Sequence, residues 1–276
     1  MLFFDFFHLA HQIKFSTFAF INRTKNQKMK LLKLTLLLTI LLQGGSALLL
    51  AQNVTDSKGL KQGEWRKLNA DGKLVYEGRF KDNIPQGTFT YYFEDGKVRS
   101  KLTYSENGKS AMGVNFHPNG KKMAEGEYIE TKKNGLWKYY NDKEVLSAEE
   151  FYQKGVPAGL WKTYYDDGKL LEECPYQNGL KEGICRQYFT DQSLKSEVSF
   201  VKGKLDGPAV FYYPNGKPML AGKSKNDLRE GTWTAYKENG EKENEIVYQA
   251  GVVASEKYYD KAREAELKND VKAIPE

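Results

Sequence analysis

A period of 24 residues runs through most of this chain. Stepping by 24 from Gly63 lands on a glycine at seven of eight points, and Ala111 is the exception. The landing points are Gly63, Gly87, Ala111, Gly135, Gly159, Gly183, Gly207 and Gly231. A fixed period without insertions is typical of repeat proteins in which each unit packs only on its neighbours. The period therefore constrains residues 63–254 to a linear array of eight similar units.

Each unit has the pattern of a β-hairpin. Counting the first glycine as position 0, pairs such as Asp71-Gly72 stand at positions 8 and 9, between two strand-like runs. Asp-Gly in this setting predicts a two-residue type I′ turn, which has positive φ at both residues. A longer loop containing glycine, as at Asn178-Gly179 or Lys202-Gly203, would lead to the next unit. The predicted fold class is all-β: an elongated single-layer antiparallel β-meander of about 16 strands, with a short C-terminal helix.

Alternation along the strands predicts two different faces. With a two-residue turn, positions 2 and 11 share an apolar face. Position 2 holds Trp65, Phe89, Trp137, Trp161 and Trp233, and position 11 holds Leu74, Val98, Leu146, Leu170 and Leu194. The opposite face carries tyrosine at position 5 and glutamate at position 14.

The position-5 tyrosines are the candidate binding residues. They are Tyr92, Tyr140, Tyr164, Tyr188, Tyr212 and Tyr236. One interpretation is ordinary sheet decoration, because tyrosine favours strands and Lys–Glu pairs are common across strands. The other is an aromatic track for an extended partner, because tyrosine offers a large, rigid contact area with a hydroxyl at its tip.

Three units depart from the pattern. Unit three has Ala111 and Gly113 in place of a glycine and an aromatic residue, and unit four has Glu144 in place of the turn glycine. Unit seven has Ala209, Ala221 and Ser224. We expect these units to be the loosest, or to mark bends in the sheet.

The two cysteines form a candidate disulfide. Cys174 and Cys185 flank the loop between units five and six, and both fall on the apolar face. If Tyr176 faces Gly183, the cysteines are cross-strand neighbours within reach of a disulfide. The alternative is two small apolar residues that fill the place of an aromatic side chain.

Residues 1–51 are predicted to be a leader. Met29-Lys30-Leu31-Leu32-Lys33 is a short basic segment, an apolar stretch follows from Leu34 to Leu42, and Ala51 is the first-choice cleavage site. This order is typical of a secretory signal peptide, so we expect a periplasmic, cell-surface or secreted protein. Translation would then start at Met29, with an unusually long leader as the alternative. Residues 52–62 would lead into the first strand.

Charge and residue types exclude several functions. The net charge is +6, but residues 1–51 hold six Lys or Arg against one Asp, a net of +5, so the remainder is +1. A nucleic-acid binder needs a concentrated basic surface. After residue 51 the only histidine is His117, in a turn, and no motif with metal-ligand or nucleophile spacing is present. We therefore expect no enzyme activity, no bound metal, no cofactor and no nucleic-acid partner.

Residues 255–276 no longer follow the hairpin repeat and instead have the pattern of a helix. Ser255 is placed to cap a helix from Glu256 through Lys272, which would contain Ala262, Ala265 and Leu267. The helix would cover the open edge of the last hairpin, which otherwise invites pairing with another chain. A partner-binding helix is the alternative.

The units resemble the MORN-repeat variant family. The resemblance covers about residues 59–254, and the closest segments are Gly135-Leu136-Trp137-Lys138-Tyr139-Tyr140 and residues 159–169. It implies an elongated single-layer β-sheet that mediates protein association or membrane contact; some bacterial members carry the label antitoxin. Fold resemblance alone says little about chemistry.

Together these features predict an exported, non-catalytic MORN-like repeat protein that acts as a binding or scaffolding module at the cell envelope. A protein is the expected partner, and a glycan or a membrane surface is the alternative. Two other functions stay open: an antitoxin-like inhibitor of a toxin–antitoxin pair, and a purely structural spacer.

Overall fold

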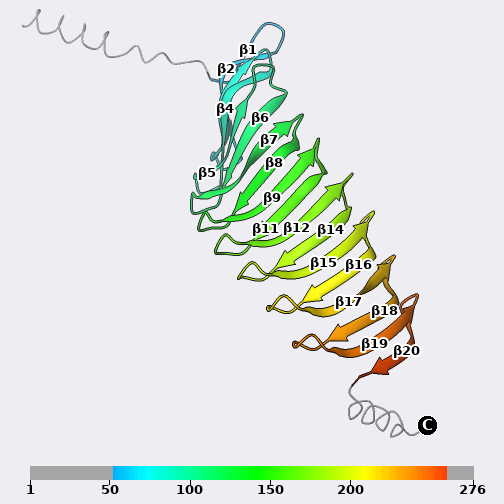
Figure 1. The fold of residues 1–276 in the computed structure, drawn as a ribbon. Helices are drawn as coiled ribbons and strands as arrows, with labels where there is room; N and C mark the ends of the chain where they lie inside the picture. Colours follow the sequence, from blue (N-terminus) through cyan, green and yellow to red (C-terminus); the bar gives the residue numbers. More distant parts are fainter. Residues whose placement is uncertain (1–51, 260–276) are drawn as a thin grey trace, which may run out of the picture. The chain divides into compact units, whose positions relative to one another are not determined.

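A computed structural model describes residues 52–259, which form one open antiparallel sheet of twenty strands with no helix. Each strand pairs with its neighbours in sequence, so the chain runs as a continuous meander (Figure 1). The predicted all-β architecture of tandem hairpins is therefore confirmed. The first 51 residues, with the predicted leader, lie outside the described residues.

The strands are β1 (Val54–Thr55), β2 (Lys61–Leu68), β3 (Leu74–Lys81), β4 (Ile84–Tyr92), β5 (Val98–Tyr104), β6 (Ser110–Phe116), β7 (Lys122–Ile129), β8 (Lys132–Tyr140), β9 (Leu146–Gln153), β10 (Val156–Pro157), β11 (Gly159–Tyr164), β12 (Leu170–Gln177), β13 (Leu180–Lys181), β14 (Gly183–Tyr188), β15 (Leu194–Val201), β16 (Lys204–Tyr212), β17 (Pro218–Lys225), β18 (Leu228–Tyr236), β19 (Lys242–Gln249) and β20 (Val252–Tyr258). β10 and β11 both pair with β9, and β13 and β14 both pair with β12. Each of these two pairs is one interrupted strand.

The type I′ turns lie between the units, not within them as predicted. Asn178 and Gly179, for example, both have positive φ (51° and 85°) and connect the paired residues Gln177 and Leu180. In the loop within unit one, residues 69–73, only Gly72 has positive φ, and its N–H donates a hydrogen bond of 3.1 Å to the Asn69 carbonyl. That geometry is a type I turn followed by a left-handed residue, which makes a three-residue loop with a bulge. Asp-Gly suits this loop as well, because only the glycine needs positive φ.

The extra residue in this loop changes which side chains share a face. Tyr140 pairs with Leu146, and Tyr139 with Ala148, so Ser147 is the bulged residue. Position 11 therefore lies on the tyrosine face, and its assignment to the apolar face was wrong. Lys122, also at position 11, confirms the correction, because its Nζ lies 2.8 Å from Glu125 and 5.5 Å from the ring centre of Tyr140.

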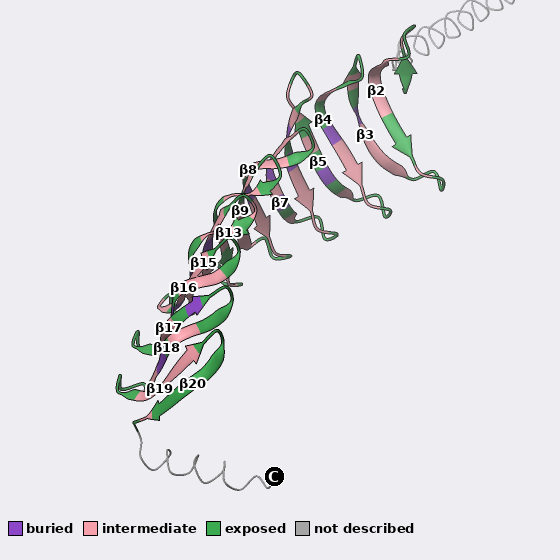
Figure 2. Ribbon diagram, turned by 90° about the vertical axis from the view of Figure 1, so that its right-hand side faces the viewer, coloured by how far each residue is buried: buried purple, intermediate pink, exposed green. Residues whose placement is uncertain are grey.

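The core consists of residue pairs across the boundaries between units, and at three boundaries a large ring packs on a glycine. Position 15 of one unit lies opposite position 2 of the next. Trp137 packs on Gly126, and a Cβ added to that glycine would stand 2.5 Å from ring atoms of the indole. Phe89 on Gly78 and Trp233 on Gly222 repeat the arrangement. Residues at position 2 are among the most buried in the sheet: Phe89, Trp137, Cys185, Ala209 and Trp233 are each at most 5% exposed. Figure 2 shows the buried stretches recurring within successive strands.

At two boundaries the sizes are reversed. Leu102 at position 15 pairs with Gly113, and Val198 pairs with Ala209. At a third, the pair is Cys174 and Cys185. At most boundaries a large side chain is thus paired with a small one, so the summed volume of the two side chains changes little, as close packing requires.

Long cationic side chains cover the aromatic rings of this face. Lys133 Nζ lies 5.0 Å from the ring centre of Trp137 and 5.0 Å from that of Tyr152. The Arg229 guanidinium lies 4.6 Å from the ring of Trp233. Such side chains bury their methylene stems while the charge stays in water. This explains how Trp137 becomes 1% exposed in a sheet without a second layer.

The chain does not enter a helix at Glu256. Residues Val252–Tyr258 form β20, which pairs with β19 through contacts such as Val247 with Ser255. The type I′ turn at Ala250-Gly251 starts this strand, as such a turn starts the first strand of units two to eight except unit three. The array therefore has one more strand than predicted and runs to Tyr258 rather than to residue 254. The rest of the predicted helix, from residue 260, lies outside the described residues.

Candidate functional site

The tyrosines at position 5 reach back across the unit boundary to glutamates at position 14. Tyr140 Oη donates a hydrogen bond of 2.6 Å to Glu125, and Tyr164 Oη donates one of 2.7 Å to Glu149. The other contacts are Tyr92 with Glu77 at 2.6 Å, Tyr188 with Glu173 at 3.0 Å and Tyr212 with Glu197 at 3.2 Å. We call this row of five contacts the Tyr–Glu ladder and its side of the sheet the Tyr–Glu face.

The ladder is interrupted at two boundaries, where one or both partners are missing. At one boundary Phe116 stands at position 5 and Lys101 at position 14, so both the hydroxyl and the carboxylate are replaced. At the last boundary Tyr236 stands opposite Ala221, and its backbone carbonyl accepts a 2.9 Å hydrogen bond from Tyr213. Tyr236 therefore belongs to the same row by position but makes no ladder contact with a glutamate.

The ladder shifts the titration of its members. Burial and the hydrogen bond to Glu125 raise the pKa of Tyr140 to about 12. The contacts of Glu125 with Lys122 and then with Tyr140 lower the pKa of that carboxyl. Both shifts favour the neutral phenol and the carboxylate, which are the forms that make the hydrogen bond. All six candidate tyrosines are half-buried, so a partner would meet the edges of their rings.

Beside the ladder lies a row of exposed apolar side chains that the sequence pattern did not single out. Leu136 and Phe151 are cross-strand partners and are 46% and 42% exposed. Position 1 supplies the others: Met112 is 56%, Leu160 45% and Ile184 44% exposed. We call these five residues the apolar row. The signal was present, since position 1 is apolar in four consecutive units while its neighbours at position 3 are largely polar.

Cys174 and Cys185 form a disulfide between β12 and β14. Both are buried, at 2% and 5% exposed. They lie at positions 15 and 2, where other boundaries place a glycine and an aromatic ring. The covalent bond thus stands in for a packing contact between units five and six.

The side chain of His117 is held in place by a hydrogen bond. Its Nε2 lies 2.9 Å from the carbonyl oxygen of Tyr140. A carbonyl can only accept, so Nε2 carries the proton. Tyr165 and Tyr213, at the same position of later units, make the equivalent contact through their hydroxyls. His117 therefore links two turns.

Residues 52–259 contain no group of three or more His, Cys, Asp or Glu side chains suited to a metal ion. In the same range no helix has the length and apolar character needed to cross a membrane.

The fold and this face define a class, the tandem β-hairpin repeat proteins, in which one hairpin unit is copied along an open sheet. The sequence model of the MORN repeat variant matches four segments of the chain, residues 61–82, 85–106, 158–178 and 205–226. The chain belongs to the MORN-repeat variant family. No curated protein matches it.

Two of the solved structures that resemble the chain are distant from it. "Crystal Structure of TarM" is 16% identical over 34% of this chain and 20% of that one, with a TM-score of 0.26. "Crystal Structure of TcdB2-TccC3" is 13% identical over 73% of this chain and 13% of that one, with a TM-score of 0.19. The chain thus spans a small part of each, and neither carries an argument about its function.

Proposed function

We propose that this chain is an exported, non-catalytic repeat protein that binds another protein along its Tyr–Glu face, as a binding or scaffolding module at the cell envelope. Membership of the MORN-repeat family supports a binding role. The basic and apolar segments before residue 52 support export.

One observation carries the choice of face: the apolar row. Its members are each 42% to 56% exposed. Leu136, Phe151 and Leu160 lie on the neighbouring strands β8, β9 and β11. Met112 and Ile184 lie further along on either side, beyond Glu127 and Pro175 of the intervening strands. Single exposed apolar residues are ordinary, but a contiguous row marks an interaction surface. The ladder beside it holds half-buried tyrosine rings in fixed positions, which lowers the entropy lost when a partner binds.

Affinity capture from envelope fractions tests this proposal. The double variant Leu136→Ser/Leu160→Ser removes the centre of the apolar row. The control, Met219→Ser/Val253→Ser, changes two residues of similar exposure (39% and 46%) on the other side of the sheet. We expect the first variant to lose a partner that the native protein and the control retain.

Equal capture by both variants would contradict the choice of face. A protein that captures nothing above background, yet loses its role when two units are deleted, would be a spacer and would contradict the binding role itself.

A further inference from the structure

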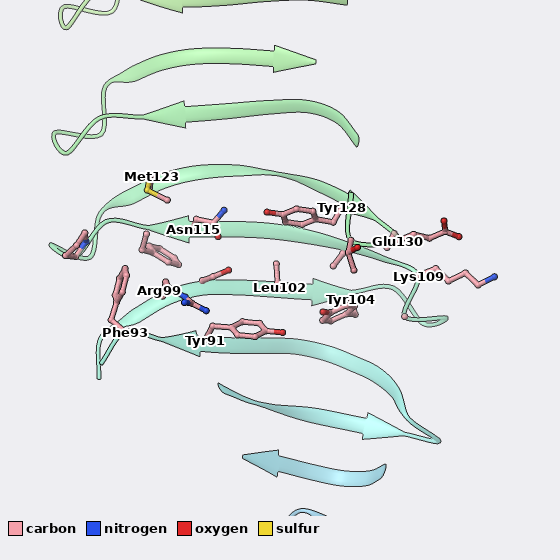
Figure 3. Close-up of a pocket in the computed structure, with 17 residues that line it drawn as sticks. Tyr91, Phe93, Arg99, Leu102, Tyr104, Lys109, Asn115, Met123, Tyr128 and Glu130 are labelled. Carbon is pink, nitrogen blue, oxygen red and sulfur yellow. The ribbon is translucent and has the colours of Figure 1, made fainter. Parts of the chain in front are cut away.

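A hollow lies on the apolar face where units two and three meet. It has a volume of about 870 Å³ and is formed by β5, β6 and β7 with the end of β4 (Figure 3). That volume falls within the range of about 300–1,000 Å³ typical of ligand pockets. The hollow opens on the side opposite the Tyr–Glu face, so it is separate from the surface proposed above.

The hollow exists because unit three breaks the packing rule of the array. Gly113 stands at position 2, where Phe89 and Trp137 fill the equivalent place in the units before and after. Leu102 stands opposite and is smaller than the missing ring. Leu102 and the ring of Tyr128 lean over Gly113, 3.2 and 2.8 Å from where a Cβ of that glycine would be, and the hollow lies beside them. The β5–β6 boundary also lacks the register shift found at β3–β4 and β7–β8, because Ala111 replaces the glycine that makes the bulge.

The walls are aromatic, one end carries a cation, and the other carries a cation together with the carboxylate of Glu130. Tyr91, Leu102, Tyr104 and Tyr128 line the centre, as Figure 3 shows. Burial raises the pKa of Tyr91 and of Tyr128, as expected for phenols held in an apolar wall. Arg99 lies toward one end and Lys109 toward the other; both side chains are exposed.

Polar side chains are spread among these walls. Ser100, Ser110, Asn115 and Thr131 also line the hollow. An alkyl chain would leave their hydrogen-bonding groups without partners, which is unfavourable. A peptide backbone supplies both donors and acceptors, so the lining favours a peptide.

We infer that the hollow is a second binding site, which takes an aromatic side chain of a partner protein against the rings of Tyr91, Tyr104 and Tyr128, with an adjacent carboxylate of the same partner paired to Arg99. Edge-to-face contact with Tyr91, Tyr104 and Tyr128 would hold the ring, as Tyr128 holds Trp137 at 4.7 Å within the sheet. A guanidinium presents a planar fork that matches a carboxylate.

Titration calorimetry of the purified full chain with short peptides tests this inference. The probe is acetyl-Asp-Trp-Asp-amide. The comparison ligands are acetyl-Lys-Trp-Lys-amide, acetyl-Asp-Ala-Asp-amide and dodecanoate. We expect binding of the first peptide only, with shifted amide resonances confined to β5–β7.

Refilling the hollow provides the decisive variant. Leu102→Gly/Gly113→Trp recreates the Gly–Trp pair seen at Gly126 and Trp137, and should abolish binding. The matched control is Val198→Gly/Ala209→Trp, the same exchange at the other reversed boundary. It should bind the peptide as the native protein does.

A second variant avoids any change in packing. Arg99→Gln should weaken the acidic peptide about tenfold, the equivalent of roughly 1.4 kcal/mol, because it removes a charge-assisted contact. Lys195→Gln, at the same position of unit six, is its control and should have no effect.

Unchanged binding in the refilled variant, equal binding of the lysine peptide, or binding of dodecanoate alone would each overturn the inference. The last result would assign the hollow to an amphiphile. The capture experiment tests binding at the Tyr–Glu face, and this titration tests binding at the hollow on the opposite face. Either proposal can therefore fail while the other stands.

Discussion

The indole ring of Trp137 lies flat against the backbone of Gly126, in the space that a side chain at residue 126 would occupy. A Cβ there would be 2.5 Å from two ring atoms of the indole. The indole N–H also donates a 3.0 Å hydrogen bond to the carbonyl of Glu127, one residue further along. Trp233 repeats this bond with Lys223 at 2.8 Å. The ring contact with Gly126 and the indole hydrogen bond to Glu127 together hold unit four against unit three.

Gly126→Ala should therefore destabilise the sheet by roughly 1–3 kcal/mol, because the added methyl group overpacks a closed contact. Urea unfolding followed by tryptophan fluorescence measures the change. In the Trp137→Ala background the same substitution should cost much less, since the ring is gone. Gly216→Asn is the control, because nothing lies within 4 Å of that glycine and asparagine tolerates its φ of 80°. A similar loss in both backgrounds would mean that the ring contact is not the cause.

Much of this fold is contained in the period of the sequence. A constant 24-residue unit leaves room for two strands and two short turns, and alternation then sorts position 2 from position 5. Trp137 and Tyr140 fall on opposite faces as predicted, because no bulge lies between them. The rule fails at position 11, as at Leu146, where a single extra loop residue reverses the alternation.

The turn types could not be assigned from Asp-Gly alone. Asp71-Gly72 fits both a type I′ turn and a type I turn with a left-handed glycine. Pairs such as Asn226-Asp227, which tolerate positive φ, gave the better signal for the turns between units. Ala111 and Gly113 mark unit three as a departure from the repeat pattern. The pattern alone does not show whether neighbouring side chains fill the space of the missing aromatic ring. The apolar row could have been found from alternation alone, because position 1 shares the face of position 5 and is apolar in four consecutive units.

Loss of the disulfide should cost roughly 3 kcal/mol. The cysteines are 11 residues apart, and closing a loop of this length restricts the unfolded chain by about that amount. Cys174→Ala/Cys185→Ala measured by urea unfolding, with thiol labelling of the native protein as the check on oxidation, gives the value. Two reactive thiols in the native protein would contradict the bond.

The packing rule suggests a replacement for this disulfide. Cys174→Gly/Cys185→Trp would install the large–small pair used at Gly126 and Trp137. It should recover part of the stability lost in the alanine variant and should make the protein insensitive to reductant. If the Gly/Trp variant is less stable than the alanine variant, then the boundary between units five and six cannot accommodate the Gly–Trp packing contact.

Alkaline pH should weaken the Tyr–Glu ladder. The pKa of Tyr140 is raised from 10.0 to about 12, so the folded state holds this proton more tightly than the unfolded chain does. The resulting stability is fully present below pH 10 and is lost as the pH rises toward 12. Urea midpoints measured across this range should fall, and Tyr140→Phe should show a shallower fall. Parallel curves for the two proteins would show that other groups control the alkaline transition.

The turn at Glu130-Thr131 stores strain that one substitution should release. Thr131 has a φ of 68° in a type I′ turn, and a β-branched residue is strongly disfavoured there. Thr131→Gly should therefore raise the free energy of unfolding by about 1 kcal/mol, even though glycine adds entropy to the unfolded chain. Gly179→Thr, at the same position of a later turn with a φ of 85°, is the matched reverse change and should lower the stability. Urea unfolding of both variants decides the matter: if Thr131→Gly is neutral or destabilising while Gly179→Thr is harmless, φ strain does not control these turns.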